Sequence, residues 1–265
     1  MTDAARVSPK DVVLEIGPGN GILTEELLKR AKKVIAVEKD VKLFNFLKQK
    51  LAEETQNGRL ILINADIRDF LHGQNGQNRV LAVDKVVANI PYYLTGQLLR
   101  LLLPKMHPQV DKARLCPPRI EKIVLMLQKE VAKRIIAGQN SVLTKRGKMN
   151  LLAISVWVYA EPKISFLVKK GNFWPQPKVD SAVVVFGKRE KDFFRQHKIS
   201  QKAFFEVVKS GFAHPRKLLK NNLKGLLDIG CRVKCGVVEN ARAEDLSLEN
   251  WACLTRSAQD IHREK

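Results

Sequence analysis

The sequence contains little that would suit a membrane or a secreted protein. No run of about 18 apolar residues is present, so we expect no transmembrane helix. The first six residues, Met-Thr-Asp-Ala-Ala-Arg, lack the apolar segment of a signal peptide. We therefore expect a cytoplasmic protein with no membrane partner.

Cysteines are also few, and their spacing indicates no metal site. The four of them form no CxxC pair, and the two that lie four positions apart have no second pair and no nearby histidine. We expect no bound metal. In a cytoplasmic protein the thiols are expected to be reduced and structural. The four residues are Cys116, Cys231, Cys235 and Cys253.

Acidic residues are scarce relative to basic ones. There are 27 Asp and Glu residues against 47 Lys and Arg residues, which gives a formal net charge of +20. Such a charge attracts polyanions, and nucleic acid is the commonest of them, because release of counterions from its phosphates drives binding. A basic surface kept for solubility is the alternative, and the size of the excess makes it the weaker one.

Short apolar runs alternate with helical patterns over the first half of the chain. The runs cover residues 11–16, 33–37, 60–63, 85–88 and 122–126, and the helical patterns cover residues 21–31, 41–54, 97–103 and 129–137. Continuous apolar strands that alternate with helices are typical of a parallel sheet covered on both faces. We expect an α/β, Rossmann-like fold.

The second half follows a different pattern. Residues 152–159 and 181–186 are predicted to form an antiparallel pair at the sheet edge, and three amphipathic helices are predicted over residues 200–210, 216–227 and 248–261. We place a boundary near residue 188, between a cofactor-binding domain (1–188) and a small helical domain (189–265). Residues 103–119 contain four prolines and are expected to form a surface loop.

The first predicted strand runs into Glu15-Ile16-Gly17-Pro18-Gly19-Asn20-Gly21. A glycine-rich turn between a strand and a helix lets a ligand approach the backbone closely. The bulky Ile22 would crowd the pyrophosphate of a dinucleotide, whereas S-adenosylmethionine has no phosphate. The spacing therefore favours S-adenosylmethionine as the cofactor, with Gly17, Gly19 and Gly21 in the loop.

Carboxylates follow the next two predicted strands. Glu38 ends the second strand and can accept both ribose hydroxyls, while Asp66 follows the third strand and can accept the adenine amine of the cofactor. Ile67 can pack on the adenine ring. Because ligands bind at the carboxyl ends of strands, two carboxylates in register with a glycine loop favour a cofactor site over solvated loop charges.

The fourth predicted strand runs directly into Asn89-Ile90-Pro91-Tyr92. An adenine amine is a poor nucleophile, and two acceptors on its hydrogens, the Asn89 side-chain oxygen and the Ile90 carbonyl, favour a nitrogen whose lone pair can attack a methyl group. Pro91 fixes the turn and has no N–H donor. Tyr92 offers a face on which an extruded base can stack. A plain strand-ending turn is the alternative.

Four motifs occur in the order found in one family. They are residues 15–21, residues 89–92, the Gln-Lys-Glu-Val-Ala segment at 128–132 and the Phe-Trp-Pro-Gln-Pro-Lys-Val-Asp-Ser-Ala segment at 173–182. The chain resembles the rRNA adenine dimethyltransferase family, of the KsgA type. Residues 216–223 look like the basic helix of its C-terminal domain, and residues 242–246 resemble its late Arg-x-Glu-x-Leu segment.

The resemblance implies a class I methyltransferase that acts in late ribosome assembly, and we expect a monomer. It implies S-adenosylmethionine as methyl donor and dimethylation of two adjacent adenosines near the 3′ end of small-subunit rRNA within a pre-ribosomal particle. The implied cofactor site includes Glu15, Gly17, Glu38, Asp66 and Asn89. Asn89 and Tyr92 would hold the target base, and Pro91 would fix the catalytic turn between them. Phe173 would be a second aromatic against it, with core packing as the alternative.

Two basic regions are predicted to form the RNA face. Between Arg100 and Lys148, Lys and Arg outnumber Asp and Glu by twelve to three. Residues 216–224 add four basic side chains and no acidic one, and these are Arg216, Lys217, Lys220 and Lys224.

The beginning of the chain departs from the resemblance. Family members usually carry some tens of residues before the first strand, with a Gln-Asn-Phe-Leu signature, and here Glu15 already lies in that strand. A site without that cover would stay wetter and hold its ligand with fewer contacts. The expectation is weak cofactor binding and low turnover unless upstream residues exist.

Two alternative functions remain open from the sequence. One is the related enzyme that methylates large-subunit rRNA and confers macrolide resistance, which shares the Asn-Ile-Pro-Tyr signature. The other is a non-enzymatic ribosome-assembly or transcription factor on the same fold.

Overall fold

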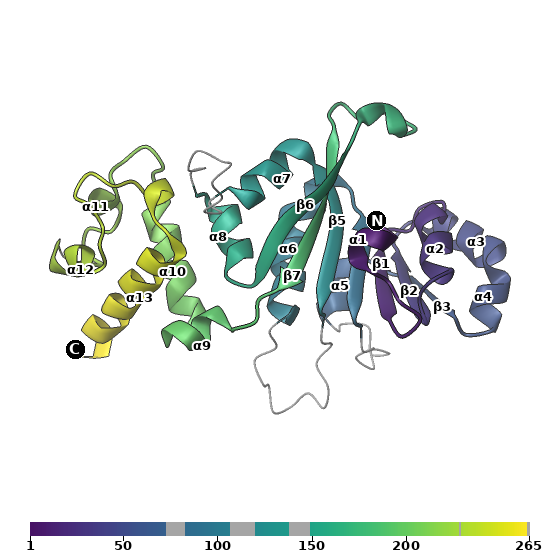
Figure 1. Cartoon of the computed structure of the whole chain (residues 1–265), viewed down its shortest axis with the longest axis horizontal. Helices are drawn as coiled ribbons and strands as arrows, with labels where there is room; N and C mark the ends of the chain where they lie inside the picture. Colours follow the sequence, from purple (N-terminus) through teal and green to yellow (C-terminus); the bar gives the residue numbers. More distant parts are fainter. Residues whose placement is uncertain (73–82, 107–119, 138–148, 228, 264–265) are drawn as a thin grey trace. The chain divides into compact units, whose positions relative to one another are not determined.

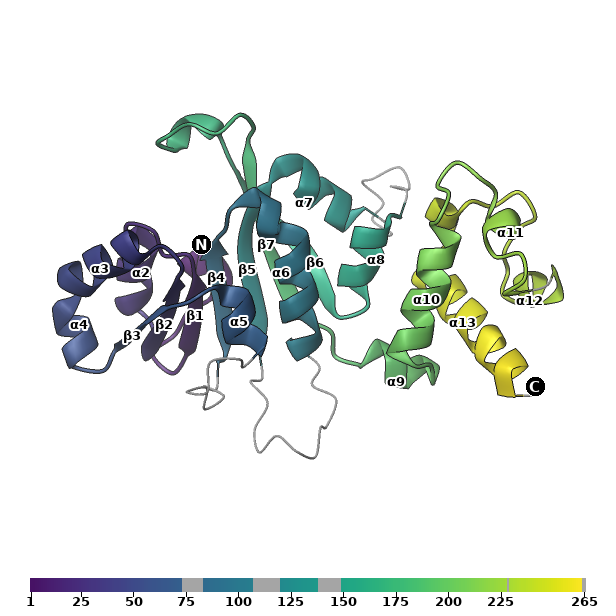
Figure 2. The same cartoon turned by 180° about the vertical axis from the view of Figure 1, so that it is seen from behind.

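A mixed seven-stranded sheet forms the centre of the first part of the chain (Figures 1 and 2). The structure is a computed structural model that describes residues 1–72, 83–106, 120–137, 149–227 and 229–263. The strand order is β3-β2-β1-β4-β5-β7-β6. The strands are β1 (Val12–Ile16), β2 (Lys33–Glu38), β3 (Leu60–Asn64), β4 (Lys85–Asn89), β5 (Lys122–Gln128), β6 (Ala160–Val168) and β7 (Ser181–Lys188).

The five strands predicted from apolar runs are confirmed, and they are mutually parallel. β7 pairs antiparallel with both β5 and β6. The class I methyltransferase fold is thereby confirmed, with its antiparallel edge. Fully buried valines at the centre of the strands, Val13, Val34, Val87, Val124 and Val183, form the core. They explain why these strands are continuous apolar runs, since both sheet faces are covered.

Helices follow most of the parallel strands. Figures 1 and 2 show α5 and α6 on one face of the sheet and α1 on the other. The N-terminus of α3 is capped by Asp40, whose side chain accepts hydrogen bonds from the N–H groups of Lys42 and Leu43. The helices here are α1 (Thr2–Ala5), α2 (Ile22–Leu28), α3 (Val41–Lys50), α4 (Ala52–Gln56), α5 (Ile67–His72), α6 (Thr95–Leu102) and α7 (Lys129–Ile136).

The strand predicted over residues 152–159 is wrong, because these residues form helix α8 (Leu151–Trp157). Asn150 caps this helix by accepting a hydrogen bond from Ala153 N–H. The apolar run is too continuous to distinguish a buried helix from a buried strand. The strand that pairs with β7 is β6, which contains Pro162 and alternates buried with exposed residues at its start, as an edge strand does.

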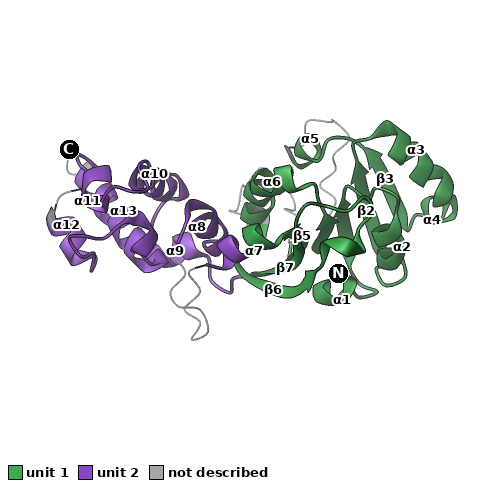
Figure 3. Cartoon of the chain, turned by 90° about the horizontal axis from the view of Figure 1, so that it is seen from above, with its two compact units in different colours: residues 1–132, 160–188 green, residues 133–159, 189–265 purple. Residues whose placement is uncertain are grey.

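The chain divides into two compact units (Figure 3). Unit 1 comprises residues 1–132 and 160–188, and unit 2 comprises residues 133–159 and 189–265. One transition between the units falls after residue 188. The other two enclose residues 133–159, which the sequence placed in the first domain. This segment, which includes α8, is part of the compact body that contains the C-terminal helices.

Unit 2 is held together by aromatic side chains. Phe193, Phe194, Phe204 and Tyr159 pack in ring contacts at centroid distances of 5.5–5.7 Å. Trp251 is fully buried, and a Cβ at Gly211 would lie 2.3 Å from its ring, so only glycine fits there. The C-terminal helices are α9 (Phe193–His197), α10 (Gln201–Gly211), α11 (Leu219–Asn222), α12 (Ile229–Lys234) and α13 (Leu248–Arg263).

The amphipathic helix predicted over residues 216–227 is largely absent. Only α11 is helical there, because Leu218 is extended at its N-terminus and Gly225 has a φ of +85°. The helices predicted over 200–210 and 248–261 are confirmed as α10 and α13. No helix among the described residues is long and apolar enough to cross a membrane.

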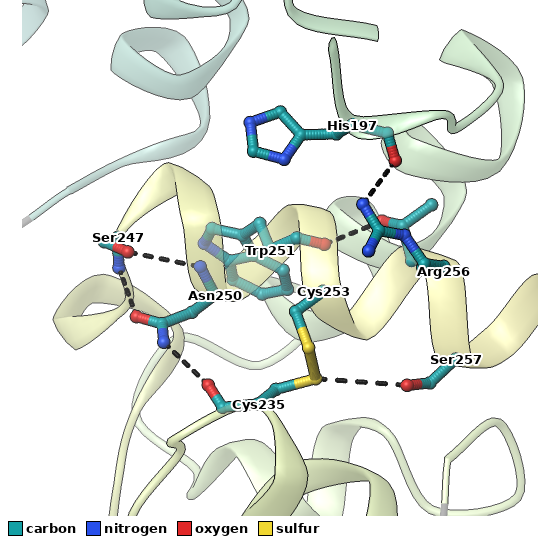
Figure 4. Close-up of a disulfide and its surroundings, with 9 residues drawn as sticks. His197, Cys235, Ser247, Asn250, Trp251, Cys253, Arg256 and Ser257 are labelled. Atoms are coloured by element: carbon teal, nitrogen blue, oxygen red, sulfur yellow. Dashed lines mark hydrogen bonds between the residues drawn. A yellow bond between two sulfur atoms is a disulfide. The ribbon is translucent and has the colours of Figure 1, made fainter. Parts of the chain in front are cut away.

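A disulfide joins Cys235 to Cys253 (Figure 4), so the reduced state expected for these two thiols is wrong. Cys235 follows α12 and Cys253 lies in α13, and contact between the two helices brings their Cα atoms to 5.5 Å. That separation suits a disulfide. The spacing of cysteines along the sequence does not show this proximity in space. Cys116 lies outside the described residues.

Candidate active site

The carboxyl ends of the parallel strands meet at one edge of the sheet. Glu38 at the end of β2 pairs with Asn64 at the end of β3, and Asn89 at the end of β4 pairs with Met126 in β5. β7 runs the other way, so its first residue, Ser181, pairs with Gln128 at the end of β5. The segment between β6 and β7 therefore reaches the same edge.

The glycine loop after β1 is shaped to approach a ligand. Gly17, Gly19 and Gly21 all have positive φ, at +65°, +59° and +86°. A Cβ at Gly17 or Gly19 would meet nothing within 4 Å, so both backbones face open space, as expected of a cradle for a cofactor. Gly21 differs, because its Cβ would lie 2.7 Å from Leu47 Cδ2; its role is close packing of α2 on α3.

Glu38 holds this loop in place. One carboxylate oxygen accepts from Gly19 N–H at 3.1 Å and the other accepts from Asp40 N–H at 2.9 Å. The side chain is buried. Each carboxylate oxygen has a further lone pair, so Glu38 fits a ribose diol while it fixes the loop.

Asp66 already has strong partners within the protein. Arg68 binds it in a bidentate way, with Nε–Oδ1 at 2.8 Å and Nη2–Oδ2 at 2.5 Å, and Lys39 Nζ lies 3.1 Å from Oδ2. The hydrogen bonds from Arg68 hold the pKa of Asp66 well below its usual range. An adenine amine that approached Asp66 would share these oxygens with Arg68. Ile67 is buried as the first residue of α5.

Glu15 lies in the middle of the sheet and is 1% exposed. Neither carboxylate oxygen meets a hydrogen-bond donor among the described residues. Burial raises the pKa of Glu15 to about 8; the hydroxyl of the neighbouring Thr24 opposes the rise, and the nearby charge of Glu38 adds to it. A cationic ligand beside this carboxyl would favour its ionised form, and the sulfonium and ammonium groups of S-adenosylmethionine are of that kind.

Asn89 and Tyr92 are placed differently from each other. Asn89 is exposed at the tip of β4, and its side chain makes no hydrogen bond to another described residue. Pro91 is exposed, with φ −56° and ψ 131°, and begins the short 3-10 turn η1 (Tyr92–Leu94). Tyr92 is half-buried, and its hydroxyl lies 2.7 Å from the hydroxyl of the buried Ser181 in β7. The bond to Ser181 fixes the orientation of the ring.

Phe173 lies in the connection between β6 and β7. It is half-buried and directly follows the turn η3 (Lys170–Asn172). The neighbouring Trp174 is 98% exposed and precedes a cis proline. No ring contact of Phe173 with another described aromatic residue is present.

The basic residues predicted in the C-terminal region do not form one uniform surface. Arg216, Lys217 and Lys224 are exposed. Lys220 is ion-paired with Glu239 at 2.8 Å, from a segment that the sequence argument did not consider. Much of the other predicted basic region, at residues 107–119 and 138–148, lies outside the described residues.

Comparison with known proteins identifies the family. Residues 1–260 match the model of the family described as ribosomal RNA adenine dimethylase. The chain belongs to this family. It is therefore an rRNA adenine dimethyltransferase, an enzyme class whose methyl donor is S-adenosylmethionine.

Relatives of this family match nearly the whole chain. The chain is 39% identical to ribosomal RNA small subunit methyltransferase A of Dehalococcoides mccartyi over 95% of its own length and 80% of the relative's length. It is 35% identical to the protein of the same name from Crocosphaera subtropica, over 96% and 90% of the two lengths.

Solved structures with low sequence identity support the fold alone. The 23S rRNA methyltransferase ErmE has a TM-score of 0.69 at 24% identity and covers 97% of this chain and 95% of its own. A dimethyladenosine transferase from Plasmodium falciparum has a TM-score of 0.68 at 24% identity, over 96% of this chain and 91% of its own.

Sequence reasoning missed two residues at the site. Ser181 was noted only as a member of the segment at 173–182. Its contact with Tyr92 comes from the pairing of β5 with β7. Arg68 follows Asp66 by two positions, a spacing that allows a local bidentate pair. The sequence therefore contained a signal for Arg68 but none for Ser181.

Proposed function

We propose that this enzyme dimethylates two adjacent adenosines near the 3′ end of small-subunit rRNA within a pre-ribosomal particle. The observation that carries the proposal is the position of Asn89, exposed at the tip of β4 on the same edge as the Gly17–Gly21 loop. The names of the relatives support the small subunit over the large one.

In this proposal the protein positions the base and accepts hydrogen bonds. The Asn89 side-chain oxygen and the Ile90 carbonyl accept the two amine hydrogens and free the nitrogen lone pair for attack. Tyr92, held by Ser181, and Phe173 stack on the extruded base. When bound, S-adenosylmethionine supplies an electrophilic methyl group. Positioning and desolvation then account for catalysis without a strong base, because the methylated nitrogen is cationic and acidic enough to release its proton to water.

The proposed cofactor contacts follow from the same edge. Gly17 and Gly19 would pass beneath the ligand, Glu38 would bind the ribose, and Asp66 with Ile67 would hold the adenine. Glu15 would face the cationic end. Both oxygens of Glu38 and both oxygens of Asp66 accept hydrogen bonds from the protein, which fixes the direction in which each side chain would meet the ligand.

The test is methyl transfer to purified small and large ribosomal subunits with a labelled donor, followed by primer extension to map the modified positions. Label on the small subunit, at two adjacent adenosines near the 3′ end, is expected. Label on the large subunit alone would favour the macrolide-resistance type of enzyme. Binding to small subunits without label transfer would favour an assembly factor.

We further propose that Arg216, Lys217, Lys220 and Lys224 contact RNA phosphates to unequal extents. Lys217 is exposed, whereas the ammonium group of Lys220 already forms an ion pair with Glu239. Lys217→Ala should therefore reduce the slope of log affinity against log salt by about one unit. Lys220→Ala should reduce it less. Equal slopes for the parent and Lys217→Ala would place the RNA face elsewhere.

A further inference from the structure

A pocket of about 330 Å³ lies in unit 1 where the β6–β7 connection meets the end of β5. It is formed by the residues around the β5–α7 junction and by the two ends of the connection. The lining residues are Gln128, Lys129, Glu130, Lys170, Lys178, Val179 and Asp180. None of these residues is used by the proposed chemistry of the adenine amine.

The pocket adjoins the candidate base site. Its wall includes Asp180, and the next residue, Ser181, lies 2.7 Å from the hydroxyl of Tyr92. Gln128, also in the wall, pairs with Ser181 across β5 and β7. A ligand group in the pocket would therefore be a near neighbour of a base stacked on Tyr92.

Asp180 joins the two sides of the pocket through its backbone carbonyl and its carboxylate. Its backbone carbonyl accepts from Lys129 N–H at 3.0 Å, and its carboxylate accepts from Lys170 N–H at 3.1 Å. Lys129 Nζ lies 3.6 Å from the carboxylate. The backbone N–H of Lys170 and the charge of Lys129 lower the pKa of Asp180, so it stays ionised. These bonds tie the connection to the β5–α7 junction.

The polar lining favours an anion. Three lysines and two carboxylates face the pocket, and one carboxylate, Asp180, is already compensated by Lys129. Lys170 and Lys178 are exposed side chains on opposite ends of the connection. Ammonium groups at such a site suit a phosphate oxygen as point charges. An adenine amine carries no anionic group, and the only anionic group of S-adenosylmethionine is its methionine carboxylate, which a measurement of cofactor affinity distinguishes from an RNA phosphate.

We propose that this pocket binds a backbone phosphate of the nucleotide next to the target adenosine, a proposal that rests on the proposed function. Extruding a base distorts the backbone on either side of it, and phosphate contacts fix the register of the strand. Trp174, in the same connection and 98% exposed, offers a stacking face for a neighbouring base. An exposed aromatic here favours RNA over free phosphate as the occupant.

The test compares two double variants with the same loss of charge. Lys170→Ala with Lys178→Ala removes the pocket lysines, and Lys10→Ala with Lys32→Ala removes two exposed lysines that precede β1 and β2, at the opposite edge of the sheet. The probe is an RNA hairpin with two adjacent loop adenosines. Affinity is measured by fluorescence anisotropy over a salt series, together with the KM for RNA and the Kd for S-adenosylmethionine.

The pocket variant should bind this RNA about tenfold more weakly than the parent, and its salt slope should fall by about one to two units, while its cofactor affinity is unchanged. The control variant should show a smaller loss of RNA affinity and a smaller fall in the salt slope. Equal losses in the two variants, or equal weakening of both ligands, would overturn the proposal.

A neutral methylphosphonate placed next to one target adenosine identifies the phosphate. It should weaken binding by the parent but not by the pocket variant; equal weakening in both would overturn the proposal. Inorganic phosphate that competes with RNA at equal strength in both variants would also count against the pocket. If the parent binds RNA through the pocket but transfers no methyl group, the pocket stands and the proposed function fails.

Discussion

Two acceptors on the cofactor side of the candidate active site, Glu38 and Asp66, differ from the acceptor Asn89 on the adenosine side in being already bonded within the protein. On the cofactor side, Glu38 accepts two backbone N–H groups and Asp66 is held by Arg68. On the adenosine side, Asn89 is exposed, and no described residue bonds to its side chain. Preorganised acceptors serve a ligand that binds in one pose. Groups open to solvent serve a base that must enter from an RNA strand.

The largest effect is expected on the adenosine side. Asn89→Ala removes an acceptor used in the transition state, so the rate of methyl transfer should fall by about 10²–10³, by analogy with loss of one preorganised group elsewhere. Its exposure at the strand tip means that the fold should be unchanged. Turnover numbers with saturating donor, together with the cofactor Kd, check this. A near-parental rate would remove Asn89 from catalysis.

The second effect concerns the buried carboxyl of Glu15. Its folded-state pKa, about 8, lies above the ordinary value of 4.5, so the folded state binds more protons between these values. The free energy of unfolding should therefore be highest below about pH 5 and fall by up to about 1.4 kcal/mol per pH unit until about pH 8. Denaturant unfolding at several pH values measures this.

Glu15→Gln is the matched variant, because it keeps the shape and removes the titration. Between pH 5 and 8, the free energy of unfolding of this variant should decrease much less than that of the parent. The cationic cofactor should bind the parent better at pH 8 than at pH 6, because ionised Glu15 then faces it. A parent whose stability rises steadily over this range would contradict the assigned burial.

A smaller change is expected for Glu38→Ala. Losing charge-assisted hydrogen bonds to the cofactor should weaken its binding by about 10- to 100-fold, from about 1.5–3 kcal/mol per bond to a charged group. The affinity of Glu38→Ala for RNA should equal that of the parent. Calorimetry with each ligand separately distinguishes the two sides of the site. Because Glu38 also binds Gly19 N–H, part of the loss would come from a looser glycine loop.

The smallest effect separates Asp66 from its guanidinium partner. Asp66 is 14% exposed and Arg68 is 41% exposed, so their ion pair is partly screened by solvent. If Arg68 competes with adenine for these oxygens, Arg68→Ala should tighten cofactor binding by about two- to fivefold, the range for an exposed ion pair. Lysine cannot bind Asp66 in a bidentate way, so the cofactor affinity of Arg68→Lys should lie between those of the parent and Arg68→Ala. Weaker binding by Arg68→Ala would mean that Arg68 orients Asp66 instead.

The parallel sheet could be predicted because its strands are buried on both faces and form unbroken apolar runs. The same logic failed at residues 152–159, where an unbroken apolar run is a buried helix. The edge strand β6 was missed because it contains Pro162 and charged residues and is covered on one side only. The periodicity of one segment does not report what packs against it.

The placement of the candidate site residues was predictable where position along a strand determines position in space. Gly17, Glu38, Asp66 and Asn89 were all inferred from strand ends, and all lie at one edge. Contacts between distant segments were not predictable. The bond between Tyr92 and Ser181, the ion pair of Lys220 with Glu239 and the disulfide between Cys235 and Cys253 each join residues whose proximity only the folded chain creates.

Whether this enzyme dimethylates the adenine amine with the help of Asn89 is best tested by nucleoside mass analysis of small-subunit rRNA. The rRNA is analysed after reaction with this protein and a donor that carries a trideuterated methyl group. The account predicts adenosine with two labelled methyl groups on the exocyclic nitrogen, and none from Asn89→Ala at matched times. Label on a ring carbon of adenine, on another nucleoside, or retained at parental level in Asn89→Ala would contradict it.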